Sequence, residues 1–211
     1  MSAHPFGQTA QADFRFWTFT ASGRPFDFVD PQPDMIDARA LAHQLSGEGR
    51  WSNNTFFPLS VAQHSLIVAR AMPRPEWRIY GLLHDAAEAF TRDWPTPLKD
   101  LALMGAPGYG GGFDIRAVER RILEQAVYPL FELPNPSAEI AQAVDIADAR
   151  ALATEYRDAV QGKGPEWIPP AEPLPGKPIK FRKRDDVEQD MLNAIFAMVR
   201  DAHRAGLRRA A

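Results

Sequence analysis

The chain has 211 residues, 45% of them apolar, and its formal net charge is −3. This length suffices for a single domain with a full hydrophobic core, and the acidic balance gives no general attraction to nucleic acid, which we therefore do not expect as a partner. The lack of cysteine excludes disulfides, thiolate catalysis and cysteine-bound zinc, so any metal must be held by nitrogen and oxygen atoms. No apolar run approaches the length of a membrane span, and we expect a cytoplasmic protein without membrane partners.

The first 33 residues are predicted to form an N-terminal arm that contains a small β-hairpin. Two aromatic stretches, FRFWTFT and RPFDFVD, flank the turn-forming residues 21–23. Asp34 is then expected to cap a first helix, which carries apolar residues through Leu45 and stops at Gly47.

Further helices are predicted wherever apolar residues recur at steps of three and four. These helices are expected over residues 59–72, 79–90, 113–131, 137–160 and 185–203. Asp185 is expected to cap the last of them. The chain is therefore predicted to be an all-α bundle of about six helices that forms one domain over residues 1–211.

Three segments between these helices lack helical periodicity. Residues 105–112 are rich in glycine but have no Lys-Ser/Thr ending of a phosphate-binding loop, so we interpret them as a linker. The prolines within residues 94–97 are expected to keep that stretch in a loop. Residues 162–184 are rich in proline and are expected to form an extended segment anchored by Trp167 and Ile168.

His84 and Asp85 form an adjacent polar pair inside an otherwise apolar helical stretch. Burying both groups costs free energy unless hydrogen bonds or a metal ion replace the water that they lose. Successive residues of a helix point about 100° apart, so both side chains could reach one ion only if it lies between their two directions. The other ligands of that ion would then come from elsewhere in the chain. Glu88 lies four residues after His84 and shares its face, where it could take part in proton transfer. A buried histidine that pairs with a neighbouring helix is the structural alternative.

Two other predicted helices carry polar groups on their core-facing stripes. One of these groups is His64, and the other is Asp148, which lies in an alanine-rich stretch. Asp145 and Glu155 are placed on a neighbouring strip of the same helix as Asp148. Two imidazoles and two carboxylates suit a divalent ion such as Mn²⁺, Co²⁺, Fe²⁺ or Zn²⁺. A purely structural histidine–aspartate pair would not require the other two groups, so the four together favour a metal site.

The order H…HD…D resembles that of the HD-domain metal-dependent phosphohydrolases. The stretches SVAQHSLIVA, LLHDAAEAFTRDWPTPLK and IADARALATE are similar to those of the branch that includes the bacterial 5'-deoxynucleotidases, and the likeness covers roughly residues 20–205. The resemblance implies an HD-domain helical bundle in which His64, His84, Asp85 and Asp148 hold one divalent metal ion, with Mn, Co, Fe, Zn and Mg as the candidates.

The same resemblance assigns roles to residues around the ion. It implies that Glu88 donates a proton or orients water, and that a second acid, Asp93, lies near the sugar. It also implies that Arg50 and Trp51 contact the phosphate and the nucleoside, and that Thr96 shapes the same pocket.

The function implied by the resemblance is removal of the 5'-phosphate of (deoxy)nucleoside monophosphates by attack of metal-bound water. One alternative is a deoxynucleoside triphosphate triphosphohydrolase, which would need more cations at the pocket, with Arg70, Arg92 and Lys99 as candidates. The other is a catalytically silent HD module that binds a nucleotide. The sequence leaves open the base and sugar preference and whether the chain forms a homo-oligomer.

Overall fold

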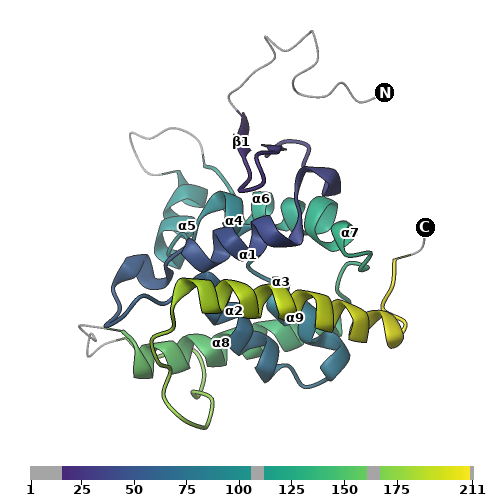
Figure 1. Ribbon diagram of the computed structural model, residues 1–211. Helices are drawn as coiled ribbons and strands as arrows, with labels where there is room; N and C mark the ends of the chain where they lie inside the picture. Colours follow the sequence, from purple (N-terminus) through teal and green to yellow (C-terminus); the bar gives the residue numbers. More distant parts are fainter. Residues whose placement is uncertain (1–15, 106–111, 161–166, 210–211) are drawn as a thin grey trace, which may run out of the picture.

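Helices make up most of the structure, together with one small antiparallel sheet (Figure 1). The computed structural model describes residues 16–105, 112–160 and 167–209. Across these residues the arrangement agrees with the predicted all-α class, and no described helix is long and apolar enough to cross a membrane. Most of the predicted glycine-rich linker and the first part of the Pro-rich segment lie outside the described residues.

The sheet confirms the predicted N-terminal hairpin. Strand β1 (Trp17–Phe19) pairs with strand β2 (Pro25–Asp27), and Thr18 lies opposite Phe26. Gly23 adopts a left-handed conformation in the connecting turn, with φ of 74°, which glycine can do without strain.

Helix α1 (Ala38–Gly47) begins after Asp37 rather than after Asp34, so the predicted cap is wrong. The Asp37 carboxylate accepts a hydrogen bond from the backbone N–H of Ala40 at 2.8 Å. Asp34 instead lies in a single 3-10 turn, Pro33–Met35, and two extended residues, Ile36 and Asp37, separate this turn from α1.

Helix α2 (Val61–Ala71) packs closely on the next helix, α3 (Arg78–Leu83). The contact requires Gly81, because a methyl group there would lie 2.7 Å from Cγ of Met72 and 3.2 Å from Cα of Ala69. The sequence therefore places a glycine where the two backbones approach each other.

A turn that contains His84 and Asp85 divides the helix predicted over residues 79–90. Helix α3 ends before this pair, and helix α4 (Glu88–Thr91) begins after it. Within the turn the backbone bonds join residues three apart, such as Glu88 N–H to Asp85 carbonyl at 3.0 Å, so the regular α-helical pattern is interrupted at the polar pair.

Helix α5 (Thr96–Met104) contradicts the prediction that prolines keep residues 94–97 in a loop. Pro97 lies in the first turn, where a helix does not use the N–H that proline lacks. The proline therefore starts the helix and does not break it.

The helix predicted over residues 113–131 is present but irregular. It consists of α6 (Ile115–Ile122), a π-helical turn (Leu123–Val127) and α7 (Tyr128–Leu130). Asp114 caps α6 by accepting a hydrogen bond from the N–H of Ala117 at 3.2 Å.

The two longest described helices are α8 (Ala138–Asp158) and α9 (Arg184–Arg204). Lys183 occupies the cap position of α9, so Asp185, which lies in the first turn, is not the cap that was predicted. A carboxylate there still interacts favourably with the helix N-terminus. In Figure 1, α9 (yellow-green) runs alongside α1 and in front of α2 and α3, and it contacts all three.

The described part of the Pro-rich segment, residues 167–183, contains no helix or strand, as predicted. Trp167 packs against the rings of Trp51 and Tyr156, with ring centroids 5.8 and 4.5 Å away. Ile168 is 84% exposed, so the prediction that it anchors the segment is wrong.

The hydrophobic core gathers fully buried apolar side chains from α1, α2, α3 and α9. Its members include Leu41, Leu45, Val61, Val68, Ile79, Leu82, Leu83, Met191 and Ile195. Since α8 packs on both α2 and α3, the same packing fixes the three segments that carry the predicted metal ligands.

Candidate metal centre

The four side chains predicted as ligands meet at one point between α2, α3 and α8. Nε2 of His64 lies 3.3 Å from Nε2 of His84 and 3.0 Å from Oδ1 of Asp148. Nε2 of His84 lies 3.2 Å from Oδ2 of Asp85 and 3.7 Å from Oδ1 of Asp148. Donor atoms about 2.0–2.2 Å from one ion lie roughly 3.0–3.5 Å apart, which agrees with the first three of these separations, while the distance from His84 to Asp148 is slightly longer. His64, His84 and Asp85 could therefore hold a metal ion. Asp148, the fourth predicted ligand, lies beside both histidines but outside this group of three.

Both imidazoles are oriented by a hydrogen bond from their other ring nitrogen. His64, which is fully buried, donates from Nδ1 to Oε1 of Glu155 at 2.7 Å. His84 donates from Nδ1 to the carbonyl of Gly81 at 3.0 Å. These bonds leave the Nε2 lone pair of each ring directed at the cluster, which is the usual arrangement for histidines that bind metal.

Glu155 is the functional residue that sequence reasoning missed, because it was placed on a strip beside that of Asp148. It is fully buried, and its second oxygen, Oε2, accepts a hydrogen bond from Nε1 of Trp51 at 2.9 Å. Seven residues along a helix are about 20° short of two full turns, so Glu155 and Asp148 share one face of α8. The seven-residue spacing in the sequence therefore indicates that Glu155 lies on the same side of α8 as Asp148.

The charges of the cluster favour a cation. Burial alone would disfavour the imidazolium form, but Asp85 and Asp148 outweigh it and raise the pKa of His84 well above its usual range. Burial would likewise raise the pKa values of Asp85 and Asp148, and the two imidazoles reverse this, so both carboxyl pKa values lie below their usual range. The carboxylates are thus held ionised around a point that attracts positive charge, which is the electrostatic condition for a divalent ion.

Arg50 lies buried against the cluster. Its Nη1 is 3.4 Å from Oδ1 of Asp93 and 3.8 Å from Oδ2 of Asp85, and its Nη2 is 3.5 Å from Oε2 of Glu155. Burial opposes the charge, but Glu155, Asp93 and Asp85 outweigh it and raise the Arg50 pKa further. Its Nε has no hydrogen-bond partner among the described residues, so one buried donor remains for a ligand.

A strained backbone holds Trp51 beside this arginine. Trp51, Ser52 and Asn53 have φ values of 57°, 50° and 63°, so three consecutive residues other than glycine are left-handed. Such conformations cost about 1–3 kcal/mol each and tend to occur at functional sites. Here the turn brings the indole N–H of Trp51 to Glu155, which in turn holds the ring of His64.

Glu88 is a buried acid beside the cluster, and its surroundings favour the protonated form. Its side chain is close to fully buried, and burial together with the charges of Asp85 and Asp93 raises its pKa well above the usual range. Oε1 lies 3.3 Å from Nζ of Lys99, while Oε2 has no partner in the part of the chain that the structure describes. A protonated carboxyl with a free oxygen can donate its proton to a bound ligand.

Of the remaining predicted residues, Asp93 is part of the site and Thr96 is not brought to it. The Asp93 carboxylate is 3.4 Å from Arg50, and burial raises its pKa. Thr96 lies exposed at the first residue of α5. Lys99 on the same helix is 2.8 Å from Oε1 of Glu119 and links α5 to α6 next to Glu88.

Comparison with known proteins identifies two relatives. An uncharacterized protein of Rhodobacter capsulatus is 33% identical over 184 residues, which cover 82% of this chain and 90% of the relative. The uncharacterized protein YfdR of Escherichia coli K12 is 31% identical over 156 residues, 74% of this chain and 79% of the relative. No protein-family model matches the sequence.

Proposed function

We propose that this chain, which belongs to the same family as the uncharacterized proteins of Rhodobacter capsulatus and Escherichia coli, is an HD-type metal-dependent phosphohydrolase. Its substrates would be nucleotides, and its reaction the removal of the 5'-phosphate from (deoxy)nucleoside monophosphates. The observation that carries the proposal is the cluster of His64, His84, Asp85 and Asp148 with a buried arginine on one side and, near it, a buried glutamic acid whose pKa is raised. The HD-domain resemblance of the sequence supplies the reaction class.

Each residue of the donor set has a defined task in this proposal. His64, His84, Asp85 and Asp148 would hold a divalent ion, which when bound lowers the pKa of water and neutralises phosphoryl oxygens. Glu155 fixes the His64 ring and so keeps its Nε2 in place.

Arg50 binds the phosphate. It is a planar, permanently charged donor whose present contacts to carboxylates are long, at 3.4 to 3.8 Å, and whose Nε is unpartnered in the described structure. A phosphate would offer it shorter, charge-assisted hydrogen bonds. Because the guanidinium is already buried and held between carboxylates, little further ordering is needed when the substrate arrives.

Glu88 supplies the proton that the reaction needs. Hydrolysis of a nucleoside 5'-phosphate releases the sugar oxygen, which must gain a proton as its bond to phosphorus breaks. Burial raises the pKa of Glu88 and so favours its protonated form, and Lys99 holds its Oε1, so the Oε2 side can deliver the proton.

The positions of the extra cations favour a monophosphate over a triphosphate substrate. Arg92 is bonded to Glu48 at 2.7 Å, and Lys99 is bonded to Glu119 at 2.8 Å. Arg70 is six residues beyond His64 on α2, about 120° around the helix. Arg50 is thus the cation that remains within ion-pair distance of the cluster residue Asp85 among the described residues.

The test is to assay metal-free protein with Mn²⁺, Co²⁺ or Mg²⁺ on a panel of nucleotides. We expect phosphate release from 5'-monophosphates that depends on the added metal. Release of triphosphate from deoxynucleoside triphosphates would establish the alternative enzyme, and nucleotide binding without turnover would indicate a binding module.

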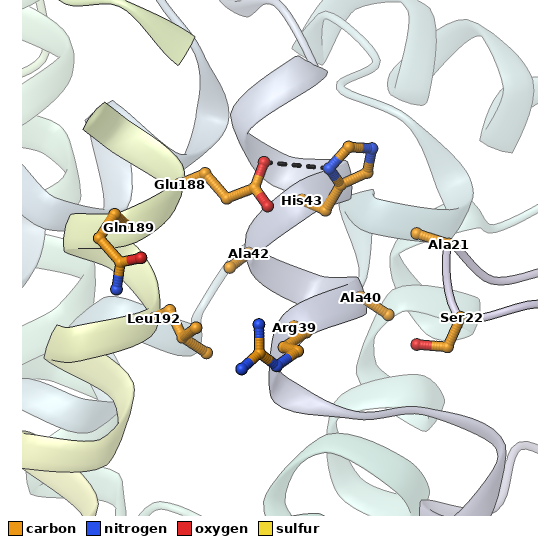
Figure 2. Close-up of a pocket in the computed structure, with 9 residues that line it drawn as sticks. All are labelled: Ala21, Ser22, Arg39, Ala40, Ala42, His43, Glu188, Gln189 and Leu192. Atoms are coloured by element: carbon orange, nitrogen blue, oxygen red, sulfur yellow. Dashed lines mark hydrogen bonds and ion pairs between the residues drawn. The ribbon is translucent and has the colours of Figure 1, made fainter. Parts of the chain in front are cut away.

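His84→Ala should abolish metal binding and hydrolysis together, since it removes one of the four donors. The matched control is His43→Ala on α1. The ring of His43 lies 3.0 Å from Oε2 of Glu188 on α9 and is not part of the donor cluster (Figure 2). Retained turnover in the His84 variant would refute the assignment of this site.

A further inference from the structure

We propose that a groove between α2, α8 and residues 174–182 is a second ligand site, for a small molecule that carries two or more phosphate groups. The groove has a volume of about 750 Å³ and lies on another face of the helices that carry His64 and Asp148. In Figure 1 the segment between α8 and α9 (light green) loops beside α8, where it forms one wall.

Five cations and no carboxylate line the groove. They are Arg70 on α2, Arg150 on α8, and Lys177, Lys180 and Arg182 on the connecting segment. Of these, Arg182 is bonded to Asp190 at 2.8 Å, and within the described structure the other four have no carboxylate at ion-pair distance. Such a concentration of charge in a chain with a net charge of −3 is suited to an anion of high charge.

Hydrogen bonds anchor the connecting segment, so the groove is already formed. Gln63 of α2 donates from its side chain to the carbonyl of Lys180 at 3.0 Å. The backbone N–H of Leu174 bonds Oγ1 of Thr154 at 2.8 Å, and that of Ile179 bonds Oδ2 of Asp158 at 2.9 Å. A ligand would therefore meet cations whose backbone positions are fixed, which reduces the entropic cost of binding.

Apolar side chains among the cations indicate that the ligand also has an apolar or planar body. These side chains are Leu66, Ile67, Leu174, Pro175 and Ile179. The volume lies within the usual range of small-molecule sites, roughly 300–1,000 Å³. By contrast, the smaller hollow of about 310 Å³ between α1 and α9 contains both signs of charge, including the paired His43 and Glu188 (Figure 2).

The groove is separate from the donor cluster, although both use α2 and α8. Arg70 points about 120° away from His64 around α2, and Arg150 points about 160° away from Asp148 around α8. A molecule in the groove would therefore contact the opposite sides of the two helices and leave the cluster accessible. The limited volume of the groove favours one small molecule over a nucleic acid strand, which would need an extended basic surface.

The proposal is tested with inorganic tripolyphosphate and metal-free protein in isothermal titration calorimetry. We expect one site, and weakening of about tenfold or more in Lys177→Glu/Lys180→Glu, because two attractions become repulsions. Arg120→Glu/Arg200→Glu, which makes the same charge change on exposed residues of α6 and α9, should bind within about twofold of the natural chain. If the double variant does not fold, Arg70→Glu provides an independent test, because Arg70 lines the groove from α2 and its replacement should also weaken tripolyphosphate binding.

A second comparison separates this site from the proposed active site. His84→Ala should bind tripolyphosphate as tightly as the natural chain, and a nucleoside triphosphate should bind more tightly than tripolyphosphate because of the apolar wall. The proposal is overturned if tripolyphosphate does not bind, if the groove variants and the control pair lose affinity equally, or if binding disappears in His84→Ala. Tighter, groove-dependent binding of a single-stranded oligonucleotide would replace the small molecule with nucleic acid.

Discussion

Replacing Glu155 by glutamine should weaken metal binding although the residue itself is not a ligand. The carboxylate accepts from Nδ1 of His64 at 2.7 Å and from Nε1 of Trp51 at 2.9 Å, through different oxygens. A glutamine has one accepting oxygen and one donating nitrogen, so whichever way the amide turns, one of these two buried donors meets a donor. The charge that faces Arg50 at 3.5 Å is also lost.

The size of the effect follows from the bond that turns unfavourable. Loss of an orienting partner of a metal-bound histidine typically weakens metal affinity by about 10- to 100-fold, which corresponds to about 1.4–2.8 kcal/mol. The unpaired buried donor should also lower the free energy of unfolding of the metal-free protein by about 1–3 kcal/mol.

The assay is competition for Mn²⁺ or Co²⁺ against a chelator, together with urea unfolding of the metal-free protein. The matched control is Asp145→Asn, the same change of charge at an exposed position of α8. Affinity and unfolding free energy that match the natural chain in Glu155→Gln would refute the role of Glu155 in orienting His64.

Three further predictions concern the acid, the pH dependence and the helix contact. Glu88→Gln should lower turnover by about 10²–10⁴-fold, because the proton donor is lost, but should retain metal affinity, because no metal ligand is changed. Loss of metal binding in the same variant would mean that Glu88 is structural. Metal affinity should still increase with pH above about 6.5, the pKa of an unperturbed histidine, because the carboxylates raise the His84 pKa despite burial and the ring must lose its proton to bind. Chelator competition that gives a constant affinity in that range would contradict this. Gly81→Ala should lower the free energy of unfolding by about 1–3 kcal/mol, because the added methyl group would lie 2.7 Å from Cγ of Met72. An unchanged midpoint of urea unfolding would show that α2 and α3 can separate at no cost.

The sequence predicted the helices and the donor set because both depend on local periodicity. His64 and Asp148 could be assigned to core-facing stripes by counting steps of three and four. The same spacing places Glu155, seven residues from Asp148, on one face of α8 with it. Spacing does not show that the Glu155 carboxylate pairs with His64, because His64 lies on another helix, α2.

Other features depended on contacts that periodicity does not contain. The cap of α1 is Asp37 and not Asp34, because Pro33 starts a separate turn before the helix. Pro97 lies in the first turn of α5, and the sequence alone does not distinguish a proline that starts a helix from one that breaks it. The left-handed run that begins at Trp51 is stabilised by a distant carboxylate, so no local rule predicts it.

The environment divides the acids of the site into two groups with different tasks. Burial raises the pKa of all of them, but for Asp85, Asp148 and Glu155 the imidazoles and Arg50 reverse the shift and hold the groups ionised. With neutral imidazoles, these three carboxylates outnumber the single guanidinium of Arg50, which favours a divalent ion at the cluster.

Glu88 and Asp93 form the other group, because for them burial and the charge of Asp85 prevail and their pKa values rise. In the proposed reaction, the raised pKa of Glu88 suits a proton donor to the leaving oxygen, and the lowered pKa values of Asp85 and Asp148 suit the binding of a cation. The same residue types in sequence therefore acquire opposite roles from their neighbours in space, and this difference supports a hydrolase more strongly than a site that only binds a nucleotide.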